Sequence, residues 1–166
     1  YSVIIGQQLG LLPEELDKIR ISALLHDVGK IGVDDRVLKK PGALTPEEFE
    51  IMRQHPAKGA NIMRPVAQLK DMLPGIELHH ESVNGQGYPY GLKGDQIPLM
   101  ARIIGVADTL DAITTNRPYQ SGRELDEALA IIRNLAGTKF DPRVVDALDF
   151  VIQSGKIRLT AVMVEA

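Results

Sequence analysis

The sequence predicts an all-α domain, a bundle of about seven helices with one long ordered loop. Apolar residues recur at helical spacing in several segments, and capping or proline start signals precede most of these segments. Pairs that contain glycine or proline separate the segments at short intervals. The chain has 166 residues, of which 44% are hydrophobic and 25% charged, so we expect one globular domain with a sizeable core.

Two helices in the first third of the chain have clear start signals. The first is predicted from Glu14 to about residue 27, because Pro13 and an acidic pair suit a first turn and Gly29 provides a stop. The second is predicted from Pro46 to about residue 54. The segment "TPEE" at 45–48 has the Thr-x-x-Glu spacing of a capping box with proline at the first helical position.

The middle of the chain is predicted to alternate short helices with breaks. His55-Pro56 predicts a joint, since the residue before a proline avoids the helical conformation. Helices are then expected over about 57–64 and 66–73, until Pro74-Gly75 breaks the chain. The stretch 84–96 is a glycine-rich loop in which Asn84-Gly85 forms a turn.

The last third is predicted to hold the central helix. Residues 99–115 are apolar almost all round, which is typical of a helix buried in the middle of a bundle. A capping box at 121–124 predicts a helix to about residue 136, and Asp141-Pro142 starts another that Gly155 ends. The tail 159–166 fits either a short strand or an ordered terminus.

The composition excludes several kinds of protein and of site. There is no cysteine, so any metal must be held by nitrogen and oxygen ligands. No apolar run approaches the roughly 20 residues that cross a bilayer, and no signal segment opens the chain, so we expect no membrane contact and a cytoplasmic location. A net charge of −3 argues against long nucleic acid as a partner. Because the chain begins at Tyr1 rather than methionine, we expect it to be a piece of a longer protein.

Acidic residues are predicted on buried helix faces. His26 and Asp27 follow Ala23 by three and four residues, which places both toward the core, and a buried carboxylate without partners costs several kcal/mol. A metal ion would satisfy Asp27, and so would a role as a helix-end residue beside Lys30, with His26 as a hydrogen-bonded core histidine. Asp108 on the central helix is likewise a carboxylate predicted on a buried helix face.

A histidine pair adds to these candidates. His79 and His80 are adjacent, and adjacent residues on a helix diverge by about 100°, so we expect them to serve two ions rather than to share one. Alone, a histidine such as His55 at a helix joint needs no function. Together the set suits two neighbouring octahedral ions, iron or manganese, that share a bridging carboxylate and hydrolyse a phosphodiester. The candidate ligands are His26, Asp27, His55, His79, His80 and Asp108.

With these motifs the sequence resembles the HD-GYP family, a branch of the HD-domain metal-dependent phosphohydrolases. The segment "HDVGK" at 26–30 matches the His-Asp-x-Gly-Lys motif of the family, and His55-Pro56 matches its His-Pro joint. Residues 79–89 match its signature from His-His-Glu to Gly-Tyr-Pro, and "DTLDAITTNRPY" at 108–119 matches a further segment. The resemblance covers nearly the whole chain, so we expect one domain over 1–166 with its core at 8–155.

The resemblance implies a helical HD-type fold and a cyclic di-GMP phosphodiesterase with two divalent ions, or three, most often iron or manganese. A metal-bridging hydroxide would attack a phosphorus, and the products would be pGpG, GMP or both. Asp27 would be the bridging ligand among the six candidates, and Lys30 would hold the scissile phosphate, so both are the predicted catalytic residues. Arg117 would be a second phosphate contact, and Tyr88 would shape the substrate pocket or a docking surface.

Some family features are altered here, which leaves alternatives open. Asn84 and Gln120 stand where the family usually has aspartate and arginine, and a preceding helix with a further histidine is expected to be missing. The alternatives are a degenerate module that binds cyclic di-GMP or a partner domain without cleavage, and a phosphohydrolase for another cyclic dinucleotide such as cyclic GMP-AMP. The family's Gly-Tyr-Pro loop also implies contact with a diguanylate-cyclase-type domain, and a homodimer stays open.

Overall fold

The structure is a computed structural model that describes residues 1–116 and 122–158. Within these ranges it is helical and contains no β-strand, only two isolated β-bridges, so the predicted all-α fold is confirmed. The predictions for Arg117, for Gln120, for the start of the capping box at Ser121 and for the tail 159–166 lie outside the described residues.

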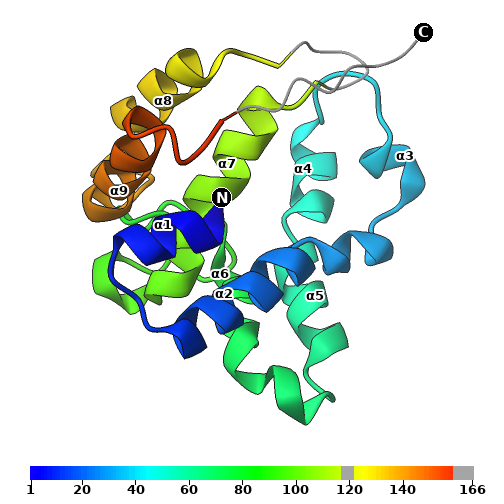
Figure 1. Ribbon diagram of the computed structural model, residues 1–166. Helices are drawn as coiled ribbons and strands as arrows, with labels where there is room; N and C mark the ends of the chain where they lie inside the picture. Colours follow the sequence, from blue (N-terminus) through cyan, green and yellow to red (C-terminus); the bar gives the residue numbers. More distant parts are fainter. Residues whose placement is uncertain (117–121, 159–166) are drawn as a thin grey trace, which may run out of the picture.

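The helices follow one another along the chain, and most of the connections between them are short (Figure 1). The α-helices are α1 (Ser2–Gln8), α2 (Pro13–Leu25), α3 (Asp35–Leu38), α4 (Pro46–Met52), α5 (His55–Met63), α6 (Leu73–Leu78), α7 (Leu99–Thr114), α8 (Leu125–Asn134) and α9 (Pro142–Gln153). The 3₁₀ helices are η1 (Val28–Gly32), η2 (Ala67–Met72) and η3 (Gly94–Gln96). Helix α7 packs against α1, α2, α6, α8 and α9, so the predicted central helix is central.

Several predicted start signals are present in the structure. The Thr45 hydroxyl accepts a hydrogen bond from the backbone N–H of Glu48, whose carboxylate accepts from the N–H of Thr45, which completes the capping box of α4. The Asp141 carboxylate accepts from the N–H of Arg143 at the start of α9. Each contact satisfies a backbone donor that the first helical turn leaves free.

Three predicted boundaries are wrong, and α1 and α3 were not predicted. Helix α5 begins at His55 itself rather than beyond the joint. Pro74 does not end a helix but lies in the first turn of α6, where its missing N–H removes no intrahelical bond. Helix α8 begins at Leu125, so Glu124 is its N-cap residue rather than a residue of its first turn, where the predicted capping box would place it.

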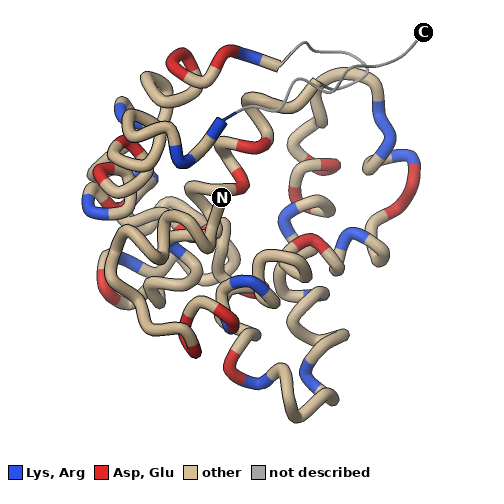
Figure 2. Tube along the Cα trace, viewed as in Figure 1, with Lys and Arg blue, Asp and Glu red and all other residues tan. Residues whose placement is uncertain are grey.

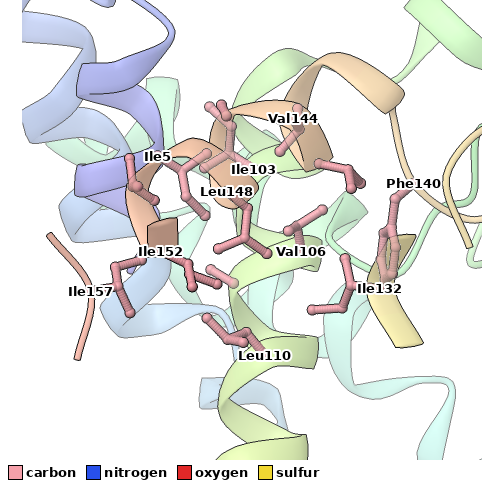
Figure 3. Close-up of a cluster of buried hydrophobic side chains, with 14 of the residues drawn as sticks. Ile5, Ile103, Val106, Leu110, Ile132, Phe140, Val144, Leu148, Ile152 and Ile157 are labelled. Atoms are coloured by element: carbon pink, nitrogen blue, oxygen red, sulfur yellow. The ribbon is translucent and has the colours of Figure 1, made fainter. Parts of the chain in front are cut away.

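The main hydrophobic core lies where α1, α7, α8 and α9 meet (Figure 3). Side chains from all four helices interdigitate there, and most of them are fully buried. The labelled members are Ile5, Ile103, Val106, Leu110, Ile132, Phe140, Val144, Leu148, Ile152 and Ile157. This core fixes α7, which carries Asp108, so the packing is coupled to the position of one candidate ligand.

Replacing Leu148 by alanine is expected to lower the free energy of unfolding by about 2–5 kcal/mol, because the substitution leaves a cavity in a closely packed core. Leu148 is 0% exposed on α9. Phe150 on the same helix is 54% exposed, and its replacement by alanine serves as the matched control, with an expected change within about 0.5 kcal/mol. Urea denaturation followed by circular dichroism measures both, and equal changes would contradict the assigned core.

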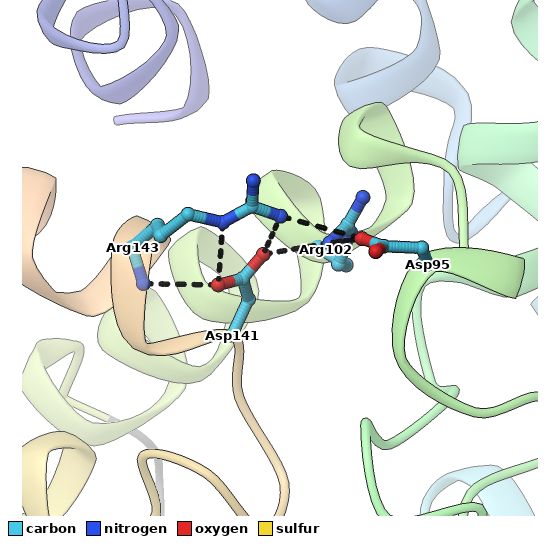
Figure 4. A network of polar contacts seen from close by, with 4 residues as sticks. All are labelled: Asp95, Arg102, Asp141 and Arg143. Atoms are coloured by element: carbon cyan, nitrogen blue, oxygen red, sulfur yellow. Dashed lines mark hydrogen bonds and ion pairs between the residues drawn. The ribbon is translucent and has the colours of Figure 1, made fainter.

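A charged network ties the start of α9 to α7 and to the loop before it (Figure 4). An Arg102 Nη1–H donates to Asp141 at 2.7 Å and to Asp95 at 3.0 Å, and an Arg143 Nη2–H donates to Asp141 at 3.0 Å. Burial opposes the charged form of Asp141, but the hydrogen bonds from Arg143 and the charge of Arg102 lower its pKa below the ordinary value. The network therefore holds the loop near the candidate site without taking part in it.

The rest of the surface is mixed in charge. Lysine and arginine alternate with aspartate and glutamate along the helices in Figure 2, without a broad basic face in that view. In the described part of the chain, no helix combines the length and apolar character needed to cross a membrane.

Candidate metal centre

The structure brings all six predicted ligands together, from four separate parts of the chain. His26 and Asp27 follow the end of α2, and His55 opens α5. His79 and His80 follow the end of α6, and Asp108 lies on α7. The Nε2 atom of His55 lies 3.2 Å from Asp27 Oδ1, and that of His26 lies 3.5 Å from Asp27 Oδ2 and 3.6 Å from Asp108 Oδ1. Asp27 is therefore at the centre of the cluster.

Three histidine rings have the same orientation relative to their own backbone. The Nδ1–H donates to the carbonyl oxygen three residues earlier, at 2.7 Å for His26, 2.8 Å for His55 and 2.9 Å for His79. A carbonyl can only accept, so Nδ1 carries a proton in each ring, and in the neutral imidazole the lone pair is then on Nε2. Each of the three Nε2 atoms is buried and has no hydrogen-bond partner among the described residues. Metal-bound histidines typically have this arrangement, because the second nitrogen fixes the ring.

The expected divergence of His79 and His80 is wrong. Helix α6 ends at Leu78, and His79 is its C-cap residue with backbone angles still in the helical region, yet the two imidazole rings lie side by side. Their ring centroids lie 4.1 Å apart. The ligand atoms of His55, His79 and His80 lie within 4.8 Å of one another, and so do those of His26, Asp27 and His79. The two groups overlap at His79, which fits a cluster of neighbouring ions better than one isolated ion.

The environment keeps the carboxylates charged and two of the histidines neutral. Burial opposes the charged form of Asp27, but contacts with His55 and Lys30 lower its pKa below the ordinary value. Burial likewise opposes the charge of Asp108, and the neighbouring His26 imidazole lowers its pKa. For His79 and His80, burial and the neighbouring histidines both lower the pKa. Anionic oxygens and neutral imidazoles are the protonation states that a divalent cation requires.

Two glycines allow the backbone segments of the site to approach closely. A Cβ atom on Gly29 would lie 1.9 Å from the carbonyl oxygen of His55, so η1 and the start of α5 can touch only at a glycine. A Cβ atom on Gly105 of α7 would lie 2.5 Å from the carbonyl oxygen of His79. The glycine of the His-Asp-x-Gly-Lys motif therefore brings Asp27 and His55 together through packing rather than through chemistry.

Glu81 has a role that the sequence alone did not assign. Its side chain is buried, and its carboxylate accepts hydrogen bonds from the backbone N–H groups of Tyr90 at 2.7 Å and Leu92 at 3.0 Å. These contacts fold the glycine-rich loop back onto the histidine pair. The sequence contained one signal for Glu81, its place directly after His80 in the His-His-Glu motif, but that motif match gave it no function.

Replacing Glu81 by alanine is expected to loosen residues 84–96, because two backbone donors lose a charged acceptor, each such bond being worth about 1.5–3 kcal/mol. Hydrogen exchange read by mass spectrometry should show faster exchange in this loop, while α9 keeps its protection. Glu77 is the control, since its carboxylate accepts from the exposed Tyr90 hydroxyl and holds no backbone group of the loop. Unchanged hydrogen exchange in E81A would contradict the proposed role of the Glu81 carboxylate in holding the loop.

Tyr88 lies beside the histidines rather than among them. Its ring stacks on His80 with centroids 4.8 Å apart, and the Arg53 guanidinium lies over the ring at 5.0 Å. A hollow of about 410 Å³ opens next to it, between the start of the loop, α4 and the turn before α9. The hollow is lined by Phe49, Arg53, His80, Ser82, Gln86, Gly87, Tyr88 and Lys139. Tyr88 is thus placed to contact a molecule bound at the centre.

Comparison with known proteins agrees with this geometry. The family model described as HD domain matches residues 1–144. A protein named cyclic di-GMP phosphodiesterase from Thermotoga maritima is 44% identical over 150 residues, which cover 86% of this chain and 39% of that protein. The 3'3'-cGAMP-specific phosphodiesterase 3 of Vibrio cholerae is 38% identical over 148 residues, 89% of this chain and 32% of its own length. The chain thus spans between 32% and 39% of these two relatives.

Solved structures share the fold. The crystal structure of a V. cholerae cyclic GMP-AMP phosphodiesterase (V-cGAP3) matches with a TM-score of 0.72 at 25% identity, over 93% of this chain and 42% of that one. Bd1817, described as an HDG"Y"P protein of Bdellovibrio bacteriovorus, matches with a TM-score of 0.73 at 23% identity, over 92% of this chain and 49% of that one. Family model, relatives and structures agree with the motifs, and the chain belongs to the HD domain family, in its HD-GYP branch.

Proposed function

We propose that the chain is the phosphodiesterase domain of a metal-dependent enzyme that hydrolyses cyclic di-GMP to pGpG, GMP or both. One observation carries the proposal: among the described residues, three buried histidine Nε2 atoms have no hydrogen-bond partner, and those of His26 and His55 lie within 3.5 Å of the Asp27 carboxylate. The third histidine, His79, has a ligand atom within 4.8 Å of those of His26 and Asp27. Such atoms are costly unless a cation binds them. Relatives named as cyclic di-GMP phosphodiesterases support the choice of substrate.

The six candidate ligands fit iron or manganese, since nitrogen and carboxylate oxygen are the only donors in the cluster. The proposed ligands are His26, Asp27, His55, His79, His80 and Asp108, with Asp27 shared between ions. Bound divalent ions lower the pKa of a water molecule toward neutrality and offset the charge of a phosphate. The protein fixes the positions of the ligand side chains in two ways. Backbone carbonyl groups orient three of the histidine rings, and the packing of η1 on α5 brings Asp27 and His55 together.

Lys30 is proposed to hold the scissile phosphate. Its ammonium group contacts Asp27 Oδ2, and its side chain is 37% exposed, so it is both tied to the centre and open to a ligand. A cation fixed there stabilises the negative charge that gathers on the phosphoryl oxygens in the transition state. Asp27 neighbours Lys30, as one sequence interpretation expects, and it also lies among the candidate ligands that the other interpretation requires.

The competing substrate is cyclic GMP-AMP. It is favoured by the relatives whose names give it as their substrate, at 38% and 36% identity. The two cyclic dinucleotides differ in one base, and the candidate ligands touch neither base in this proposal. Substrate choice must therefore be measured rather than inferred from the metal centre.

The test is a turnover assay with the protein purified without metal and then loaded with manganese or ferrous iron. Cyclic di-GMP and cyclic GMP-AMP are supplied separately, and the products are separated by chromatography against pGpG and GMP standards. Faster hydrolysis of cyclic di-GMP supports the proposal. Faster hydrolysis of cyclic GMP-AMP would make that molecule the substrate instead. No turnover with either ion would contradict the enzyme and favour a binding module without catalysis.

A further inference from the structure

The hollow beside His80 contains a cation that the proposed mechanism does not use. Lys139 lies in the turn between α8 and α9 and lines this hollow together with Arg53, Gln86 and Tyr88. It also lines a narrow gap that reaches His79. A single lysine therefore borders both histidines of the adjacent pair.

The backbone around Lys139 is fixed to the glycine-rich loop. The Lys139 carbonyl oxygen accepts a hydrogen bond from the N–H of Val83 at 3.2 Å, and the Thr138 carbonyl oxygen accepts from the N–H of Asn84 at 3.0 Å. These two bonds tie the turn to the loop, so the backbone of Lys139 is fixed beside the centre rather than carried on a free segment. Preorganised cations of this kind bind anions with little loss of entropy.

The Lys139 ammonium lacks an anionic partner in the described part of the chain. It lies over the Phe140 ring instead, with Nζ 4.9 Å from the ring centroid. Other lysines around the site are engaged, Lys30 with Asp27, Lys40 with Glu48 and Lys58 with a backbone carbonyl. Lys139 is half-buried, and burial lowers its pKa, although the charge of Asp108 opposes this shift. A half-buried cation that forms no ion pair among the described residues is available to bind an anion.

The other cation of the hollow is less available. An Arg53 Nη1–H donates to Glu50 at 2.7 Å, and the guanidinium lies over Tyr88. Arg53 therefore positions the Tyr88 ring, and Lys139 is the cation of the hollow that can bind an anion.

We propose that this hollow is a second phosphate subsite, in which the Lys139 ammonium holds the phosphate of the cyclic dinucleotide that is not being cleaved. The inference rests on the proposed function, because a cyclic dinucleotide carries two phosphates and Lys30 accounts for one. Lys30 is tied to Asp27, whereas Lys139 lines a hollow together with His80, so the two lysines lie beside different ligands of the same centre. The pair would distinguish a cyclic dinucleotide from a simple phosphodiester.

The experiment compares Lys139→Ala with Lys139→Arg and with the control Lys156→Ala, all loaded with manganese. Lys156 is matched because its ammonium also lies over a phenylalanine ring, at 5.5 Å from the Phe150 centroid, but it is exposed and lines none of the hollows around the histidines. Steady-state kinetics are measured with cyclic di-GMP and with bis(p-nitrophenyl) phosphate, which has a single phosphate. Equilibrium binding of cyclic di-GMP is measured by calorimetry in parallel.

For K139A we expect the KM for cyclic di-GMP to rise roughly ten- to hundredfold with little change in kcat, as for the loss of a charge-assisted hydrogen bond made equally in ground and transition states. The KM for the small diester should change far less, K139R should restore most of the affinity, and K156A should match the wild type. A KM unchanged in K139A, or an equal change with both substrates, would overturn the subsite.

Failure of the proposed function is distinguishable from failure of the subsite. If the wild type binds cyclic di-GMP without cleaving it, the proposed hydrolysis fails, and calorimetry of K139A still decides the role of Lys139. If the wild type neither binds nor cleaves it, both proposals are overturned.

Discussion

Replacing Asp27 by alanine is expected to lower the hydrolysis rate of cyclic di-GMP by more than roughly a hundredfold. Mutation of a residue that only hydrogen-bonds to a metal ligand already lowers metal affinity or activity roughly ten- to hundredfold, and a ligand itself should matter more. Asp27 lies within 3.5 Å of the Nε2 atoms of both His26 and His55, and it also contacts Lys30. The substitution therefore removes the carboxylate that lies between His26 and His55. Turnover and the metal content of the purified protein measure the effect together.

Asp17→Asn is the matched control for this substitution, because Asp17 lies on the exposed face of α2, the helix that leads to Asp27. The control should keep both its metal content and its turnover, and circular dichroism should show that both variants are folded. An Asp27→Ala protein that retains metal and activity at the level of the control would remove Asp27 from the site.

Replacing Gly29 by alanine is expected to destabilise the fold by about 1–3 kcal/mol or more, as overpacking does at a site without free space. The new methyl group would overlap the His55 carbonyl oxygen and the backbone nitrogen of Gly59, at 1.9 Å and 2.5 Å from the Cβ position. Backbone atoms cannot rotate away as a side chain can, so η1 and α5 must separate. Thermal unfolding measures the loss of stability.

The same substitution is expected to weaken metal binding and turnover by roughly a hundredfold, since a displacement of about 1 Å can cost that much in a positioned site. The separation would move Asp27, at the start of η1, away from His55, at the start of α5. Gly32→Ala is the control in the same 3₁₀ helix, because its Cβ atom would meet only the flexible Lys58 side chain, at 3.2 Å. Equal effects of the two substitutions would show that the close contact at Gly29 is unimportant.

Local sequence signals predicted much of the fold. The helices that begin at Pro13, Pro46 and Pro142 follow start signals whose partners lie within a few residues, so the sequence contains everything they need. The start of α6 was mistaken because Pro74-Gly75 is compatible with either a break or a first helical turn. Tertiary packing decides between the two, and a short window of sequence does not include it.

The sequence by itself determined the candidate ligands, the absence of thiolate donors and the family, because residue types and their spacing along the chain are sufficient for these. Only the tertiary structure decided how the ligands meet. It shows that His79 and His80 converge beyond the end of a helix, that Glu81 clamps the loop and that Lys139 approaches from a distant turn. The physical reason is that these contacts join residues far apart in the chain, and their distances depend on how helices pack rather than on any local pattern.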